Sequence, residues 1–465
     1  MTRVDLAVVG GGVSGLAAAW EGVRRGASVV VVEAGDRVGG KLGTSALGDR
    51  LVDESADAFL ARVPDAIELC RELGLAADLV SPAVGSAFVW SEGALRRLPA
   101  EQLLGVPTDL DAVAASRILS PAGIERAAAD LALPADAPAG DESVGALVRR
   151  RLGDEVLDRL VAPLIGGIWA GDCDALSLLT AAPGVAAARD RGEPSLMRAA
   201  AAARADALAA AAAAGDRPVF LAPAGGMGAL VDALRDALGD RIRTGAPVDA
   251  LTALTGPGGG WRLEPVGIEA GAVVVATPAF AAAPLVAPHA PLAGKVLGGV
   301  EHASVALVGL VVPREAVDRE LDGSGYLVPR SAGRLLTACS WVSTKWAHQA
   351  GDGSTVVLRA SAGHAGDDRA LRMDDDALVT AVRRDLADTM ALHGDPVAVR
   401  VNRWPRSFPQ PRPGHLDDVA AAEADLASHA PGLAATGAWA RGVGIPACIK
   451  GARAAAARLL TTPDA

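Results

Sequence analysis

Cysteine is rare in this sequence, and its few copies lie far apart. The four cysteines are Cys70, Cys173, Cys339 and Cys448, and no two of them form a C-x-x-C pair. A disulfide framework or a structural zinc site needs cysteines or histidines at short, regular spacings. The sequence therefore predicts a protein of a reducing compartment, without disulfides and without a metal site.

Basic residues and long apolar runs are also scarce. Lysine and arginine total 44 against 55 aspartates and glutamates, a formal net charge of -11. A nucleic-acid surface needs clustered positive charge, so we expect no nucleic-acid partner. No stretch reaches the roughly 18 to 20 apolar residues of a membrane-spanning helix. The apolar start at 4–9 leads into a glycine motif rather than a signal-peptide cleavage site. We therefore expect a cytoplasmic protein.

The first residues of the chain carry its strongest motif. An apolar stretch at 5–9 precedes Gly10-x-Gly12-x-x-Gly15, a helical segment, a second apolar stretch at 28–32, and Glu33. In a dinucleotide-binding unit these glycines permit a tight turn, close approach of a pyrophosphate and packing of helix on strand. The helix N-terminus then faces the phosphates, and Glu33 can accept ribose hydroxyls. A glycine turn without a ligand is the alternative.

The residues that follow Glu33 resemble a known family. The chain continues Ala34-Gly35-Asp36-Arg37-Val38-Gly39-Gly40-Lys41, which is similar to the flavin amine-oxidase and protoporphyrinogen-oxidase superfamily. The resemblance implies FAD rather than NAD as the cofactor. It implies FAD contacts at Gly10, Gly12, Val13, Ser14, Gly15, Glu33, Ala34, Gly39, Gly40, Lys41, Val248, Thr277, Gly442, Val443, Gly444 and Ile445.

A second glycine-rich turn does not repeat the nucleotide motif. Residues 218–221 are typical of a strand, and Gly225-Gly226-Met227-Gly228 precedes a helical pattern at 230–238. The third glycine of the fingerprint is missing there, and no other segment predicts a nicotinamide site. We therefore expect an oxidase that passes electrons to oxygen or another acceptor.

The apolar patterns predict an α/β fold with several parts. At 465 residues and 51% hydrophobic content the chain can form two or three domains. We expect a discontinuous Rossmann-like FAD-binding domain, a mixed α+β substrate domain and an inserted helical domain. The expected bounds are 1–75, 215–300 and 421–465 for the FAD-binding domain, 76–106 and 301–420 for the substrate domain, and 107–214 for the helical insert.

Further strands are expected at 245–251, 272–278, 304–312 and 355–359. In the superfamily, a valine in the first of these strands contacts the adenine through its backbone, and Val248 matches it. A valine of the sheet core is the alternative reading. The alanine-rich tract at 199–214 predicts a surface helix or linker.

The C-terminal segment predicts a helix that follows a glycine-rich turn. Residues 437–446 contain three glycines and end in Pro446, and the helical pattern continues to Leu460. A helix N-terminus aimed at the flavin pyrimidine edge would stabilise its negative charge on reduction by roughly 0.3 to 1 kcal/mol. An ordinary capped helix is the alternative.

Other segments are similar to one branch of the superfamily, the protoporphyrinogen and coproporphyrinogen III oxidases of haem synthesis. These segments are 53–60, 98–108, 141–144, 163–172, 176–177, 323–329, 343–346 and 442–449, together with Trp404 and the residues at 409–410 and 414–416. The chain departs from the branch at three positions. Ala447 replaces a common aspartate, Trp169 a smaller aromatic residue, and Pro411 a tyrosine. The shape of the pocket is expected to differ accordingly.

The branch implies oxidation of coproporphyrinogen III to coproporphyrin III. A methylene-bridge C–H leaves as hydride to the flavin in successive two-electron steps, and oxygen takes the electrons with release of H2O2. Such chemistry needs orientation more than acid–base machinery, which agrees with the lack of a Ser-His-Asp, Cys-His or paired-carboxylate motif. Protoporphyrinogen IX is the alternative substrate. The implied partners are the porphyrinogen, molecular oxygen, a peripheral membrane contact and a transient contact with the next haem-pathway enzyme.

The resemblance also suggests residues for the substrate pocket. Gly167 matches a glycine whose carbonyl faces the pyrrole N–H groups, and Leu310 matches an aliphatic residue that packs against the macrocycle. A helix-end glycine and a sheet-core leucine are the alternatives. Cations suited to the propionates are Arg62, Lys345, Arg359 and Arg403, with solvated surface residues as the alternative. His415 follows a Pro-Gly turn and is expected to be structural.

Three other functions compete with this one. An amine oxidase usually frames its flavin with aromatic residues, but aromatics are only 3% of this chain and Tyr326 is the single tyrosine. A carotenoid-type desaturase would need a stronger membrane surface. A flavin-free binding partner of the haem pathway would not need the intact glycine fingerprint.

Overall fold

The computed structural model describes residues 3–134, 140–213, 218–255 and 258–461. Its N-terminal unit consists of β1 (Arg3–Val9), α1 (Val13–Arg24) and β2 (Val29–Val32). The two strands are parallel, with Leu6 opposite Val29. This is the strand–turn–helix–strand unit that the glycine motif predicts.

The first sheet collects strands from distant parts of the chain. Its order is β12-β2-β1-β15-β14-β13, and β21 also pairs with β15. β15 runs parallel to β1 and β21 and antiparallel to β14. The added strands are β12 (Ile242–Arg243), β13 (Ala250–Ala253), β14 (Trp261–Glu264), β15 (Ile268–Val275) and β21 (Leu433–Ala435).

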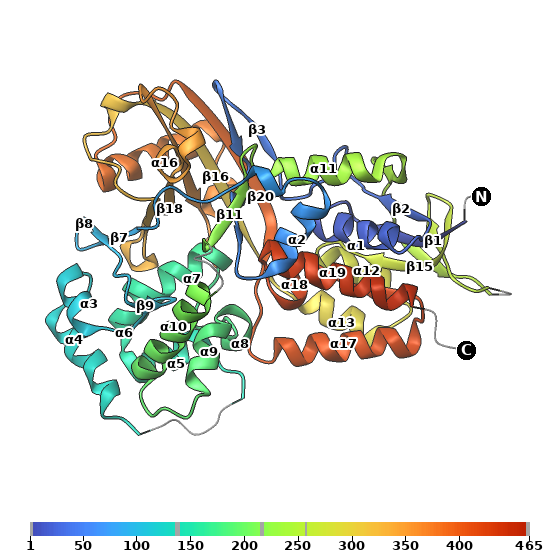
Figure 1. Ribbon diagram of the computed structural model, residues 1–465, viewed down its shortest axis with the longest axis horizontal. Coiled ribbons are helices and arrows are strands. Elements are labelled where there is room, and N and C mark those ends of the chain that lie inside the picture. The colour runs from blue at the N-terminus through green and yellow to red at the C-terminus, as the bar shows by residue number, and fades with distance from the viewer. Residues whose placement is uncertain (1–2, 135–139, 214–217, 256–257, 462–465) are drawn as a thin grey trace.

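Helices cover both faces of this sheet (Figure 1). Leu6 and Val8 of β1 belong to one core cluster, and Ala7 and Val9 to the other, because successive side chains of a strand point to opposite faces. The first cluster contains α1, α2 (Pro64–Glu72), α11 (Gly228–Leu238) and α19 (Ile445–Leu460). The second contains α12 (Ala279–Val286), α13 (Pro291–Gly299), α17 (His415–His429) and α18 (Ala438–Arg441).

The second large sheet is mostly antiparallel. Its order is β20-β16-β19-β18-β17-β7-β8. Among the described strand pairs of this sheet, only β7–β17 is parallel. The strands are β7 (Phe88–Ser91), β8 (Ala94–Arg97), β16 (His302–Pro313), β17 (Gly325–Leu327), β18 (Leu336–Trp341), β19 (Thr355–Ala362) and β20 (Ala398–Pro409).

The two faces of the second sheet have different neighbours. On one face, α16 (Asp375–Met390) packs with Leu310 and Leu358 in a buried cluster. On the other face, Val311 joins the core cluster of Leu47, in the hairpin of β3 (Thr44–Leu47) and β4 (Arg50–Asp53). The second face is therefore turned toward the first sheet. The short helices α14 (Val342–Lys345) and α15 (Arg369–Arg372) lie beside this sheet.

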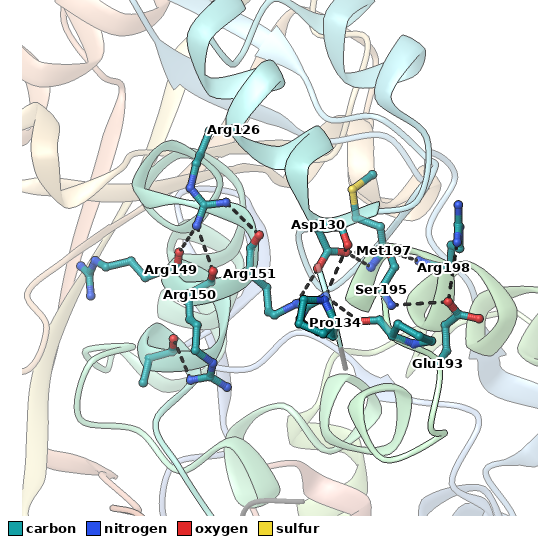
Figure 2. A network of polar contacts seen from close by, with 12 residues as sticks. Arg126, Asp130, Pro134, Arg149, Arg150, Arg151, Glu193, Ser195, Met197 and Arg198 are labelled. Atoms are coloured by element: carbon teal, nitrogen blue, oxygen red, sulfur yellow. Dashed lines mark hydrogen bonds and ion pairs between the residues drawn. The ribbon is translucent and has the colours of Figure 1, made fainter. Parts of the chain in front are cut away.

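A helical region joins the two sheets and has its own core. Its helices are α3 (Leu110–Ser116), α4 (Pro121–Ala128), α5 (Val144–Leu152), α6 (Asp154–Val156), α7 (Ala162–Trp169), α8 (Leu178–Ala181), α9 (Pro183–Arg189) and α10 (Leu196–Ala213). Figure 2 shows the buried Arg151–Asp130 ion pair within it. Asp130 also accepts hydrogen bonds from the Ser195 hydroxyl at 2.7 Å and the Met197 amide at 2.9 Å. This network ties the start of α10 to α5.

Short strands complete the structure. β11 (Phe220–Pro223) pairs with β5 (Phe59–Leu60) and β6 (Leu79–Val80), and β9 (Gln102–Leu103) pairs with β10 (Val106–Pro107). The strand predicted at 218–221 is thus found two residues later. No helix among the residues with assigned positions is long and apolar enough to cross a membrane.

The strand predicted at 245–251 is wrong for most of its length, because β13 begins only at Ala250. Gly245 has a φ of +62°, outside the strand region, and Pro247 has no N–H to donate. The amides of Gly245 and Ala246 instead bond the carbonyls of Gly35 and Glu33, at 2.7 and 2.9 Å. Val248 therefore lies on an extended loop beside the end of β2.

Candidate active site

The glycine turn after β1 leaves an open side with free donors. Gly10 has a φ of +103°, and a Cβ at Gly15 would overlap the Gly10 carbonyl oxygen, so both positions require glycine. A Cβ at Gly12 would meet nothing within 4 Å. The amides of Val13, Ser14 and Gly15 have no hydrogen-bond partner among the described residues. The turn therefore offers donors at a helix N-terminus to an anionic ligand.

The second glycine pair packs against this turn. Gly39 and Gly40 both have positive φ, +103° and +57°. The Gly39 amide donates to the Gly11 carbonyl at 2.8 Å, and a Cβ at Gly40 would lie 3.1 Å from the Gly12 Cα. The family-like segment at 34–41 is thus in contact with the fingerprint turn.

Glu33 is held rigidly at the end of β2. Its two carboxylate oxygens accept hydrogen bonds from the amides of Gly11 at 2.7 Å and Gly35 at 2.8 Å. Ala34 beside it is exposed. The backbone amide and carbonyl of Val248 have no partner among the described residues. The Glu33 carboxylate and the Val248 backbone lie near the outer end of the first glycine turn, where the ribose and base of a nucleotide would be bound.

A buried hydroxyl without a partner lies next to Gly10. The Thr277 Oγ1 is buried and has no hydrogen-bond partner in the described structure, while its Cγ2 would be 3.1 Å from a Cβ at Gly10. Buried polar groups in native proteins are almost always hydrogen-bonded. An orphaned hydroxyl beside an open glycine turn fits a polar ligand such as a flavin nucleotide.

The glycine turn before α19 bridges two cores. Gly444 is the N-cap of the helix, and Pro446 occupies its first turn. Val443 packs against the core of the helical region, whereas Ile445 is buried in the core of the first sheet. Ala447 has no side-chain acceptor, so the hydrogen bond expected of an aspartate is absent. The start of α19 therefore lies where the first sheet meets the helical region.

Lys41 points toward the second sheet. Its ammonium donates to the Ser407 carbonyl of β20 at 2.6 Å. Desolvation by the surrounding protein lowers the pKa of Lys41, and the nearby Cys448 acts in the opposite direction. The side chain therefore links the fingerprint turn to β20 at the start of α19.

Two of the predicted propionate ligands are engaged by a carboxylate. The Lys345 ammonium lies 2.9 Å from both oxygens of Asp57, and the Arg359 Nη2 lies 3.3 Å from one of them. Burial raises the pKa of Asp57, but the two cations outweigh it and hold that pKa well below its usual range. The Arg359 Nη1 is buried without a partner, and Arg359 lines a cavity of about 10 Å³ with Asp53 and Trp346. That volume holds about one water molecule.

Leu310 and Arg403 do not reach this side of the second sheet. Leu310 is fully buried in the core with α16, so the sheet-core alternative is the correct reading of its position. Arg403 donates to the Ala370 carbonyl and to Asp375 on the same side. Arg62 follows β5 and is exposed, with no polar partner among the described residues.

Gly167 lies at the exposed end of α7. Its carbonyl has no donor among the described residues, and a Cβ there would lie 3.3 Å from the Leu327 Cδ2. The following residues are fixed to the second sheet, because the Trp169 carbonyl accepts from the Gln410 side chain at 2.9 Å. The Ala170 carbonyl likewise accepts from the Ala365 amide at 2.7 Å. The Trp169 ring is buried and donates to the Ala181 carbonyl, so it belongs to the helical core.

Sequence reasoning missed the aromatic and basic residues opposite α7. Ala170 packs with Ala303, Val305, Trp404 and Phe408 in a small cluster. Arg406 lies between the two aromatic residues on β20, and its guanidinium stacks 3.6 Å from the centre of the Phe280 ring. Trp404 is one of the residues that resemble the family, but no local sequence pattern indicates a function for Arg406 or Phe280.

The surroundings of His415 favour the structural role that we expect from its position in the sequence. The imidazole is buried, and its Nε2 bonds the Trp439 carbonyl at 2.7 Å. The described residues also contain no group of three or more histidines, cysteines or acidic residues that could hold a metal ion.

Residues 13–460 match the sequence profile of flavin containing amine oxidoreductases. The chain belongs to this family. It is 33% identical to the coproporphyrinogen III oxidase of Bacillus subtilis over 99% of this chain and 98% of that protein. A crystal structure of a proposed protoporphyrinogen oxidase from Exiguobacterium sp. 255-15 superposes with a TM-score of 0.85, 28% identity and 98% coverage of both chains. Putrescine oxidase shares the fold at a TM-score of 0.68 and 20% identity, over 98% of this chain and 99% of that one. Membership implies a flavin cofactor and oxidoreductase activity.

Proposed function

We propose that this chain is an oxygen-dependent FAD oxidase of haem synthesis that converts coproporphyrinogen III to coproporphyrin III. The observation that carries the proposal is the full-length similarity to a protein named coproporphyrinogen III oxidase. Within this family the open glycine turn and the orphaned Thr277 hydroxyl support a dinucleotide flavin. Protoporphyrinogen IX is the second candidate substrate, supported by the similarity in structure to the Exiguobacterium protein.

The cofactor side of the proposal rests on polar backbone groups. The turns at 10–15 and 39–40 would hold the pyrophosphate, and Glu33 would accept the ribose hydroxyls. The backbone of Val248 would contact the adenine, and Thr277 would gain the partner that its hydroxyl lacks. The residues at 442–445 would stand at the pyrimidine edge, at the start of α19. FAD, when bound, supplies a two-electron acceptor that oxygen reoxidises with release of H2O2.

The substrate side of the proposal rests on Gly167. Its free carbonyl would accept hydrogen bonds from pyrrole N–H groups, and the exposed Ile168 beside it would pack against the macrocycle. The chain's task is to orient a methylene bridge and to exclude competing reactions. Lys345 and Arg359 would act through Asp57 rather than on a propionate. Arg62 remains a candidate for a carboxylate at the rim.

We also propose a division of the chain into domains. In this proposal the segments 1–75, 215–300 and 421–465 form the FAD-binding domain, and all strands of the first sheet fall within them. The segments 76–106 and 301–420 form the substrate domain, and 107–214 form the helical insert. A cytoplasmic location, peripheral membrane contact and transient contact with the next haem-pathway enzyme stay predictions.

Anaerobic mixing tests the proposed reaction without interference from oxygen. We expect coproporphyrinogen III to bleach the visible flavin absorbance of the purified protein, and admission of air to restore it with the appearance of porphyrin fluorescence. Putrescine serves as the control substrate for amine oxidation. Bleaching by putrescine but not by either porphyrinogen would contradict the proposal and support an amine oxidase.

A further inference from the structure

The backbone at Arg406 is held in an unusual conformation. Arg406 has a φ of +48°, although it is not glycine, and it lies where the β16–β20 register shifts between Ala303 and Val305. Its amide donates to the Ser304 hydroxyl at 2.9 Å, which fixes the irregularity. Strained, non-glycine positions at β-bulges commonly re-aim a side chain for function.

The guanidinium of Arg406 is oriented by an aromatic ring and lacks a counter-ion. It lies 3.6 Å from the centre of the Phe280 ring, and His302 packs edge-on against the same ring at 5.2 Å. Arg406 is exposed, and no carboxylate of the described residues is within ion-pair distance of it or of Lys41. We call Lys41, Phe280, His302 and Arg406 the Arg406 cluster. Burial lowers the pKa of His302, and the positive charges of Lys41 and Arg406 also lower it.

The Arg406 cluster lies between the two halves of the candidate site. Phe280 follows Thr277, beside the fingerprint turn, by three residues at the start of α12. Trp404 and Phe408 flank Arg406 on β20 and pack with Ala170, at the end of the helix that carries Gly167. Unlike most arginines of this chain, Arg406 is thus exposed, oriented and uncompensated where the two halves meet.

We infer that Arg406, supported by Lys41, binds a carboxylate of the substrate and favours a porphyrinogen with more carboxylates over one with fewer. The inference rests on the proposed function and deepens it, because coproporphyrinogen III carries four propionates and protoporphyrinogen IX two. Arginine binds carboxylates and phosphates by the same charge-assisted hydrogen bonds. The other source of such an anion is the FAD pyrophosphate, so the test must separate the two.

Arg406→Gln tests the inference in the flavin-loaded protein. We expect the Kd for coproporphyrin III, measured by fluorescence, and the KM for coproporphyrinogen III each to rise about tenfold. The KM for protoporphyrinogen IX should rise less, and the Kd for FAD, measured by titration of the stripped protein, should stay unchanged. Arg372→Gln is the matched control, because Arg372 is an exposed arginine paired with Asp368 on α15. It should change none of these values.

Three outcomes would overturn the inference. One is an unchanged Kd for coproporphyrin III in Arg406→Gln. Another is a raised Kd for FAD, which would assign Arg406 to the pyrophosphate. The third is an equal loss of affinity for both porphyrins. Failure of the proposed function looks different, because the wild-type protein would then oxidise neither porphyrinogen, whereas porphyrin binding to wild type and variant could still be compared.

Discussion

Two groups of cations on the second sheet and its neighbours differ in what compensates their charge. Lys345 and Arg359 share the partly buried carboxylate of Asp57, whereas Arg406 stacks on Phe280 and has no carboxylate partner in the described structure. Arg406 also requires a strained backbone, while Lys345 and Arg359 lie in regular elements. Lys345 and Arg359 therefore have the features of a structural ion cluster, whereas Arg406 has the features of a residue that binds an external anion.

The comparison shows that residue type alone does not reveal which cation is available. A buried cation pair costs several kcal/mol of desolvation per ion unless a counter-ion compensates it. Asp57 provides that compensation through its contacts with Lys345 and Arg359. A substrate carboxylate would have to displace Asp57 to reach Lys345 or Arg359, but nothing has to be displaced at Arg406.

The largest expected effect is that of Asp57→Ala on stability. The substitution leaves the partly buried Lys345 and Arg359 without their counter-ion, which should destabilise the folded protein by about 3 kcal/mol, the lower end of the cost for fully buried ions. Urea unfolding followed by tryptophan fluorescence measures the change. The control is Asp318→Ala, because Asp318 is exposed and pairs only with His393; its effect should stay within about 0.5 kcal/mol. Equal effects of the two substitutions would remove the distinction between the cation groups.

Because the pKa of Asp57 is lowered in the folded protein, we expect its contribution to stability to depend on pH. The folded-state pKa of Asp57 lies below its unfolded value of about 3.9. Its stabilising contribution is therefore complete above that value and is lost as the pH falls toward the folded-state pKa. The stability gap between the wild type and Asp57→Ala should be constant near neutral pH and should narrow below about pH 4. A gap that widens on acidification would show that the cations do not stabilise the ionised carboxylate.

The next expected effect concerns Gly167 and turnover. In Gly167→Leu the side chain would project from the exposed end of α7 beside Leu327, where the macrocycle is proposed to bind, and we expect turnover of coproporphyrinogen III to fall about a hundredfold through misplacement of the substrate. Flavin content, read from the visible spectrum, should not change. Gly85→Ala is the control, because a Cβ at Gly85 meets nothing within 4 Å. Normal turnover in Gly167→Leu would remove Gly167 from the site.

Arg406→Gln should have the opposite signature to Asp57→Ala. Because Arg406 has no ion-pair partner to lose, its substitution should change stability by no more than about 0.5 kcal/mol, while porphyrin affinity falls. The same urea experiment as for Asp57→Ala measures the stability. A loss of several kcal/mol would instead make Arg406 a structural residue like Lys345 and Arg359.

The smallest expected effect is that of Phe280→Leu. Removing the ring abolishes a cation–π contact worth about 0.5 to 1 kcal/mol at an exposed site, or a two- to fivefold loss of affinity for coproporphyrin III. Fluorescence titration of the flavin-loaded variant measures it. An affinity equal to that of the wild type would show that the ring does not orient Arg406.

Local rules were sufficient to predict the strand–turn–helix–strand unit around the first glycine turn from the sequence. The glycines at 10 and 15 act through sterics within one turn, and the structure shows the predicted strand, turn and helix around them. The C-terminal helix after Pro446 likewise follows from its own turn. The strand at 245–251 was predicted too early, because its apolar pattern outweighed Gly245 and Pro247.

The substrate side depends on contacts between distant residues, which no local pattern reveals. β16 is apolar at almost every position because both of its faces are covered, so its alternation could not show that Leu310 faces α16. The sequence does not show that Lys345 and Arg359 pair with Asp57, because Asp57 is distant from both along the chain. Arg406 needed its backbone conformation and the distant Phe280 to become distinguishable from other arginines.

Steady-state oxidation in air tests directly whether this protein oxidises porphyrinogens. Purified, flavin-loaded protein would be given coproporphyrinogen III and protoporphyrinogen IX in parallel, with heat-denatured protein as the control for spontaneous oxidation. We expect the flavin-loaded protein to form porphyrin faster than the control when oxygen is present, with a higher kcat/KM for coproporphyrinogen III than for protoporphyrinogen IX. Bound flavin with no oxidation of either porphyrinogen above the control would contradict this expectation.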